Sequence, residues 1–150
     1  MLRFAVTSFD NWGDLQGAIR DLRAKGLADA AFNCLCLARI CQQKPASLTA
    51  CVSRPEQDLV FAGTPERICC SHGILADRLT ARAGGGAETL ATALQSWLIA
   101  RHAEQVQQSV LAGRIVLWVE LSDDTAERNA YDALLAHSCH PVGVHDLVNG

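Results

Sequence analysis

The chain has 150 residues, of which 49% are hydrophobic and 19% are charged, and its formal net charge at pH 7 is -3. This composition predicts a single globular domain over residues 1–150 and excludes a disordered chain. Because nucleic-acid partners favour a basic surface, we expect none here. No membrane partner is expected either, since no apolar run is long enough to span a bilayer and Asp10 interrupts the first segment before a signal-peptide core develops. The predicted location is the cytoplasm.

Seven cysteines are distributed along the chain. Without an export signal, we expect reduced thiols rather than a disulfide framework. Cys34, Cys36 and Cys69 fall in apolar segments, where a thiol behaves as a small hydrophobe. The run Cys69-Cys70-Ser71-His72 sets thiols beside a base, but adjacent residues on a strand point to opposite faces. We therefore interpret that run as part of a buried strand rather than as a catalytic site.

The start of the chain has the pattern of a strand–helix–strand unit. Alternating apolar residues indicate a strand over Leu2–Phe9. Spacings of three and four predict a helix near Asn11–Lys25, capped by Asp10 or Asn11. A second strand is predicted over Phe32–Ile40.

Residues 41–113 are predicted to be an insertion, mostly helical from residue 73. Gln42–Gln57 is polar and holds two prolines, so it is expected to be irregular. A hairpin is predicted from the short strands Asp58–Ala62 and Arg67–Ser71. Gly73–Ala83 is predicted to be a helix, and Ala87–Ala112 is predicted to be either one long helix or two shorter ones.

The end of the chain repeats the plan of the start. A strand is predicted over Arg114–Leu121, a helix over Asp124–His137 and a last strand over Val142–Val148. Asp124 followed by Glu127 has the form of a capping box at the helix start.

Two strand–helix–strand units predict an α+β, ferredoxin-like sandwich with one antiparallel sheet, strand order 4-1-3-2, and a helical insertion between strands 2 and 3. Alternation assigns one sheet face to the two helices of the units. The other face is predicted to be apolar and to need a cover, either the insertion, a second subunit or a ligand. Its predicted residues include Cys34, Cys36, Val116, Trp118 and His145.

Two blocks that cover roughly half of the chain carry a family resemblance. They are FAVTSFDNWGDLQGAIRDLRAKGL with NCLCLAR, and LAGRIVLWVELSDDTAERNAYDALLAHSCHPVGVHDL. In these blocks the chain resembles the small bacterial general-stress-protein domain and related bacterial proteins of unknown function. The resemblance implies a fold and a link to stress physiology, but no reaction. Membrane-associated relatives have a glycine-rich apolar hairpin in the middle, which charged residues interrupt here: Asp77, Arg78, Arg82 and Glu88.

Candidate site residues are few, and none is predicted to be catalytic. Cys34, Cys36, Trp118 and His145 are candidates for a ligand site on the far sheet face, with apolar packing as the preferred interpretation. His137, Cys139 and His140 have side chains suited to zinc or copper. Because no C-x-x-C pair or regular ligand spacing accompanies them, we predict neither a metal nor a cofactor.

The leading functional prediction is a non-enzymatic cytoplasmic regulatory or interaction protein, related to stress and forming a homodimer. The alternative is a small-molecule or metal-binding protein, an enzyme included, with a pocket between the sheet and residues 72–112. A pocket that gathers His, Cys, Glu or Arg side chains would favour the alternative.

Overall fold

The structure, a computed structural model, describes residues 2–46, 48, 56–64, 66–71 and 74–147. Its centre is a six-stranded sheet in the order β3-β4-β2-β5-β1-β6, in which every neighbouring pair is antiparallel. The strands are β1 (Leu2–Phe9), β2 (Phe32–Leu37), β3 (Glu56–Leu59), β4 (Ile68–Ser71), β5 (Ile115–Leu121) and β6 (Gly143–Leu147). The helices are α1 (Trp12–Ala24), a 3-10 turn η1 (Asp29–Ala31), α2 (Ala38–Cys41), α3 (Ile74–Gly84), α4 (Leu90–Leu94), α5 (Ala100–Leu111) and α6 (Asp124–His137).

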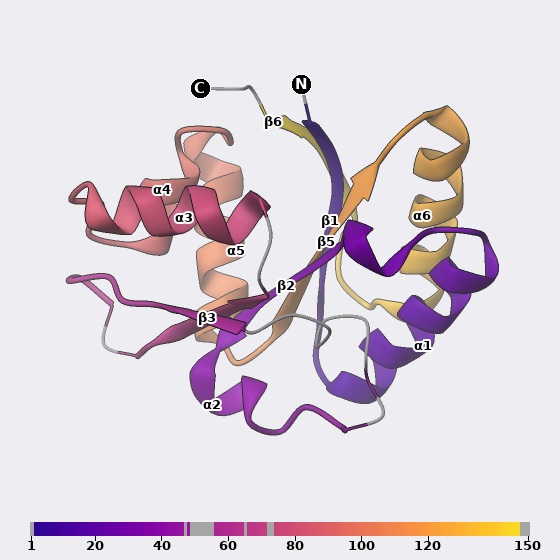
Figure 1. Cartoon of the computed structure of the whole chain (residues 1–150), viewed down its shortest axis with the longest axis horizontal. Helices are drawn as coiled ribbons and strands as arrows, with labels where there is room; N and C mark the ends of the chain where they lie inside the picture. Colours follow the sequence, from indigo (N-terminus) through magenta and orange to yellow (C-terminus); the bar gives the residue numbers. More distant parts are fainter. Residues whose placement is uncertain (1, 47, 49–55, 65, 72–73, 148–150) are drawn as a thin grey trace.

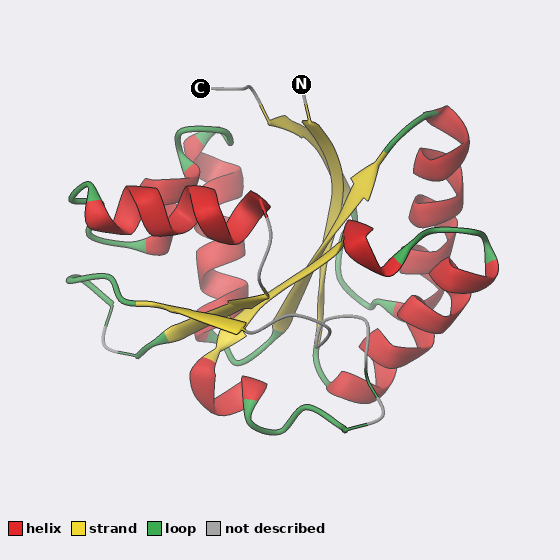
Figure 2. Cartoon of the chain, viewed as in Figure 1, coloured by secondary structure: helices red, strands yellow, loops and turns green. Residues whose placement is uncertain are grey.

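The sheet separates two layers of helices (Figure 1). Helices α1 and α6 cover one face, and α3, α4 and α5 cover the other. Figure 2 shows the same α+β arrangement coloured by secondary structure. The apolar far face expected from the sequence is thus covered by the chain's own insertion. The prediction of a homodimer depended largely on an uncovered sheet face, and in this structure that face is covered.

Both helices of the terminal units begin at polar caps. The Asn11 side chain accepts a hydrogen bond from the Asp14 N–H at 2.8 Å, which starts α1. The Asp123 side chain accepts from the Ala126 N–H at 2.7 Å, so the cap of α6 lies one residue before the predicted Asp124. After α1, Gly26 has a φ of 92° and takes the left-handed conformation that ends the helix.

The order of the four terminal strands is as predicted, with β6-β1-β5-β2 corresponding to 4-1-3-2. The sheet nevertheless has six strands rather than four, because the insertion adds the hairpin β3–β4 at the β2 edge. A two-unit ferredoxin-like sandwich is therefore not confirmed as the whole architecture. From residue 74 the insertion contributes α3, α4 and α5.

The second strand is shorter than predicted. Register pairing with β4 ends at Leu37 opposite Ile68, and the chain turns at once into α2 instead of continuing to Ile40. The Ala38 N–H donates to the Arg67 carbonyl at 2.9 Å, and the Trp12 indole N–H donates to the Ile40 carbonyl at 3.0 Å. These two bonds hold α2 across the end of the sheet.

The predicted placement of Cys34 and Cys36 on the same face as Trp118 is wrong. In the β2–β5 register Cys34 lies opposite Leu117, so it shares the face covered by α1 and α6. Trp118 packs on the other face, under the inserted helices, where Phe4 contacts it edge to face at 6.0 Å between ring centroids. Every residue of β2 is buried. The alternation of cysteine and leucine in this strand therefore does not show which of the two residue types faces α1 and α6.

Among the described helices, none is both long enough and apolar enough to cross a membrane.

Candidate functional site

The connection between α6 and β6 is fastened to the end of β1 by two hydroxyl groups. The Ser138 hydroxyl donates to the Ser8 carbonyl at 2.7 Å and accepts the His140 N–H at 3.0 Å. The Thr7 hydroxyl donates to the Pro141 carbonyl at 2.9 Å. The backbone of this connection is thereby fixed, and the His140 side chain is directed to the end of β1.

Asp10, directly after β1, contacts two nitrogen-bearing side chains from different parts of the chain. Its Oδ1 accepts the His140 Nε2–H at 2.7 Å and lies 3.3 Å from the Arg114 Nε. The β1–β5 register explains the second contact, because Phe9 pairs with Ile115 and their outer neighbours are Asp10 and Arg114. The bond from His140 holds the pKa of the Asp10 carboxyl below its usual value, so Asp10 stays charged at neutral pH.

Two further histidines meet between β6 and α5. The rings of His145 and His102 lie 4.9 Å apart between centroids, in an edge-to-face arrangement. Burial, and then the nearby His102, lower the pKa of His145. Gly143 leaves room for this ring, since a Cβ there would lie 2.9 Å from the His145 Nε2.

These groups border a pocket of about 510 Å³ between the sheet and α5, which we call the α5 pocket. One arginine and three histidines line it, together with small polar and apolar side chains, and none of its described lining residues is acidic. The lining is Val6, Thr7, Ser8, His102, Gln105, Val106, Gln108, Ser109, Arg114, Val116, His140, Pro141, Val142, Gly143, Val144 and His145. Asp10 is not among the lining residues, but it contacts both Arg114 and His140.

Asp10, Cys139 and His140 also form a group whose side chains could share a metal ion. One ligand atom of each lies within 4.8 Å of the others. Both carboxylate oxygens are already engaged, because the Cys139 thiol donates to Oδ2 at 3.4 Å while His140 occupies Oδ1. The hydrogen bond to Asp10 raises the pKa of Cys139, so the sulfur is a thiol rather than a thiolate at neutral pH. The hydrogen bonds account for this cluster without an ion.

The sequence-predicted candidates lie in four different places. His140 and His145 line the α5 pocket, and Cys139 adjoins it through Asp10. His137 lies elsewhere, with its Nε2 3.4 Å from the Asp21 Oδ2 on α1. Cys34 and Cys36 lie on the opposite sheet face, and Trp118 is fully buried in the core.

Sequence reasoning missed Arg114, Asp10 and His102 as site residues. These three residues are far apart or on different elements in the sequence, so no short motif contains them. The signal available was the antiparallel pairing of the first and third terminal strands, which sets the residue after one strand beside the residue before the other.

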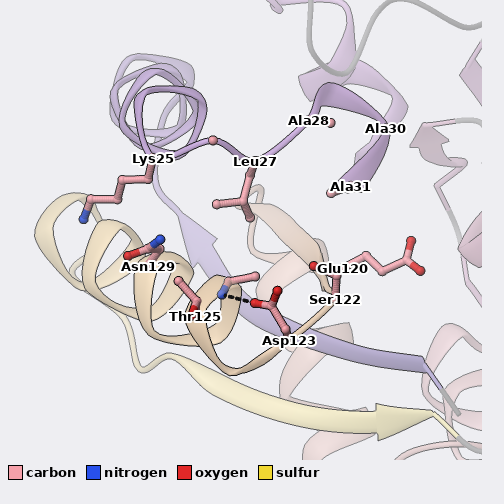
Figure 3. A pocket seen from close by; sticks show the side chains of 12 residues that line it. Lys25, Leu27, Ala28, Ala30, Ala31, Glu120, Ser122, Asp123, Thr125 and Asn129 are labelled. Carbon is pink, nitrogen blue, oxygen red and sulfur yellow. Dashed lines mark hydrogen bonds between the residues drawn. The ribbon is translucent and has the colours of Figure 1, made fainter.

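A second pocket, of about 490 Å³, lies between the segment after α1 and the start of α6. Figure 3 shows Leu27 in its middle, with Lys25 and Glu120 at opposite ends of the view. Asp123 points at the backbone it caps, and Ala28, Ala30 and Ala31 lie on the segment after Leu27. Its polar groups do not converge on one point, so it offers less chemistry than the α5 pocket.

No family model, no curated protein and no solved structure matches this chain in sequence or structure comparisons.

Proposed function

We propose that this protein binds a small organic anion in the α5 pocket. The observation that carries the proposal is the convergence of Arg114, His102, His140 and His145 on a pocket whose described lining has no acidic side chain. A volume of about 510 Å³ is within the range of small-molecule sites. This is the alternative of the two functions that the sequence predicts.

The pocket offers donors for an oxyanion and apolar surface for a short carbon chain. The guanidinium of Arg114 presents donors in a fixed fork that matches a carboxylate or a phosphate. Val6, Val106 and Val116 provide apolar surface for a short carbon skeleton. The shared ligand chemistry is therefore an oxyanion on a small organic group.

The histidines make binding dependent on pH. Burial favours the neutral form of His145 in the empty pocket. A bound anion favours the imidazolium, so binding should take up a proton and strengthen as the pH falls from neutral.

The proposal is for binding rather than for chemistry. Cys139 adjoins the pocket through Asp10, and its raised pKa keeps it protonated there. We also propose that the two terminal units are a ferredoxin-like core and that ligand binding serves a cytoplasmic regulatory role related to stress. The strand order of those units and the resemblance of the two terminal blocks support this second part.

Isothermal titration calorimetry with inorganic phosphate, succinate and uncharged succinamide tests the proposal. We expect heat from phosphate or succinate and none from succinamide. Arg114→Gln should weaken the binding by about tenfold, which is the usual value of a charge-assisted hydrogen bond. Arg101→Gln is the matched control, because Arg101 is an exposed α5 residue outside the lining and its loss should leave affinity unchanged.

Repeating the titration in buffers of different ionisation enthalpy reports proton uptake. The proposal predicts net uptake near neutral pH. Equal affinity for succinate and succinamide, or equal losses in the Arg114 and Arg101 variants, would overturn it.

A further inference from the structure

Two cysteine sulfurs lie in contact on the sheet face opposite to the α5 pocket. Cys41 is the last residue of α2 and Cys69 lies in β4, and their Sγ atoms are 3.1 Å apart. This separation is about 1 Å longer than the roughly 2.05 Å of a disulfide bond. Cys69 also faces Cys36 across the β2–β4 pair, so α2 turns back over two cross-strand thiols.

The position of Cys41 is held by contacts on three sides. The Trp12 indole bonds the Ile40 carbonyl, as described above, and the Ala38 N–H bonds the carbonyl of Arg67, two residues before Cys69. The Arg39 Nε lies 3.0 Å from the Glu66 Oε1. Because α2 is tied both to α1 and to the start of β4, the closeness of the two sulfurs follows from the packing of three elements.

The surrounding groups make the two sulfurs chemically unequal. The thiols of Cys36 and Cys69, together with Lys44, lower the pKa of Cys41, because hydrogen bonds and a nearby cation stabilise its thiolate. The same bonds and burial raise the pKa values of Cys36 and Cys69. One thiolate is therefore held beside two protonated thiols.

Of these three thiols, Cys41 and Cys69 are the two that a small molecule can reach from the surface. Cys41 and Cys69 together line a surface pocket of about 140 Å³, bordered also by Asp58 and Arg67. Cys36 is not among the residues that line that pocket, and it is only 2% exposed. A small oxidant that enters from the surface meets Cys41 and Cys69 before it meets Cys36.

We propose that Cys41 and Cys69 are a dithiol that a hydroperoxide oxidises to a disulfide, with Cys41 as the attacking sulfur and Cys69 as the resolving one. With hydrogen peroxide, an S–O bond forms at Cys41 as the O–O bond breaks, and the departing oxygen takes up a proton and leaves as water. The Cys69 sulfur then attacks the sulfenic acid, the S–S bond forms as the S–O bond breaks, and the second water carries away the Cys69 proton.

The two sulfurs lose two electrons in this sequence, and the peroxide gains them. Two molecules of a low-molecular-weight thiol restore the dithiol by exchange and become a disulfide themselves. The proposal is independent of the anion site, since it uses other residues on the other face of the sheet.

The test is disulfide mapping of the whole protein after treatment with one equivalent of hydrogen peroxide. Remaining thiols are blocked and the chain is digested with trypsin without reductant. We expect a link between Cys41 and Cys69 that lowers the combined peptide mass by two hydrogen atoms and disappears with dithiothreitol.

Fragmentation of the linked peptides is needed to assign the sulfurs. Lys44 and Arg54 each precede a proline, where trypsin cuts poorly, so Cys41 and Cys51 remain together in the peptide 40–67. The partner peptide likewise contains two adjacent cysteines.

Matched variants decide the same question independently. The link should survive Cys51→Ser and Cys70→Ala, and it should be lost in Cys41→Ser and Cys69→Ser. In Cys69→Ser, dimedone should trap a sulfenic acid at Cys41. A link made through Cys36, Cys51 or Cys70 instead would overturn the assignment.

A measurement on the unaltered chain removes any dependence on the folding of variants. At about pH 6, iodoacetamide should alkylate Cys41 about tenfold or more faster than the exposed Cys139, because alkylation follows the thiolate fraction. Faster alkylation of Cys139, or oxidation of Cys139 without a Cys41–Cys69 link, would contradict the proposal.

Discussion

The Oδ1 of Asp10 lies 2.7 Å from the Nε2 of His140, and this bond connects the end of β1 to the segment after α6. The same oxygen lies 3.3 Å from Arg114. One carboxylate therefore sets the position of two of the four cationic or titratable side chains that line the α5 pocket. Asp10 itself is not among the residues that line the pocket.

Asp10→Asn should destabilise the protein in a pH-dependent way. Because the folded-state pKa of Asp10 lies below its unfolded value, the carboxylate contributes stability at neutral pH and loses that contribution as the pH falls through the folded pKa. Urea denaturation at several pH values should show the largest difference between wild type and variant near neutrality. A difference that persists undiminished below the folded-state pKa of Asp10 would contradict a stabilising carboxylate at this position.

Ser138→Ala should loosen the connection that presents His140. The variant loses the donor to the Ser8 carbonyl and the acceptor of the His140 N–H, at a cost of about 1 kcal/mol in the free energy of unfolding. Hydrogen exchange should accelerate at the His140 amide. Ser109→Ala is the control, since Ser109 borders the pocket from α5 and is remote in sequence from this connection.

Trp118 tests the packing of the inserted helices on the sheet. Trp118→Ala should cost about 3–5 kcal/mol in the free energy of unfolding, because it leaves a cavity beside Phe4. Trp118→Phe should cost much less, since the indole Nε1 is buried without a hydrogen-bond partner in the described part of the chain. Equal losses in the two variants would mean that the ring does not pack as described.

Gly17 and His137 test the contact between α1 and α6. A Cβ at Gly17 would lie 2.9 Å from the His137 Nδ1, so Gly17→Ala sets a gain in helix propensity of about 1 kcal/mol against a displaced ring. In a His137→Ala background there is no imidazole ring for the new Cβ to meet. Gly17→Ala should then show its full gain in the free energy of unfolding. A double-mutant cycle measures the difference, and a coupling energy of zero would place the two helices further apart.

The terminal units could be predicted from sequence because their signals are local. Alternation in Ile115–Leu121, the Asn11 cap and the Gly26 helix end each depend on neighbours in the chain. The order of the four terminal strands then follows from general rules on connections.

The errors lie where local signals are ambiguous. Every residue of β2 is buried, so its alternation of Cys34 and Cys36 with Leu35 and Leu37 does not choose a face. The choice is made by pairing with β5, which sets Cys34 opposite Leu117. The early end of β2 likewise depends on the Arg67 carbonyl, far along the chain.

The candidate site was predictable in part for the same reason. His140 and His145 are close in sequence and were identified as candidates, whereas His102 joins them only because α5 folds back over β6. The partnership of Cys41 with Cys69 is also non-local, since it needs both the turn into α2 and the β2–β4 register.

The most direct test of anion binding is a histidine-resolved NMR titration of the protein with succinate near neutral pH. The ring signals of His102, His140 and His145 should move with a single dissociation constant, and His145 should shift towards its imidazolium position as the site fills. His137, which contacts Asp21 rather than the pocket, is the internal control and should stay in place. Unchanged signals from the three pocket histidines, or an equal movement of His137, would contradict an anion site between the sheet and α5.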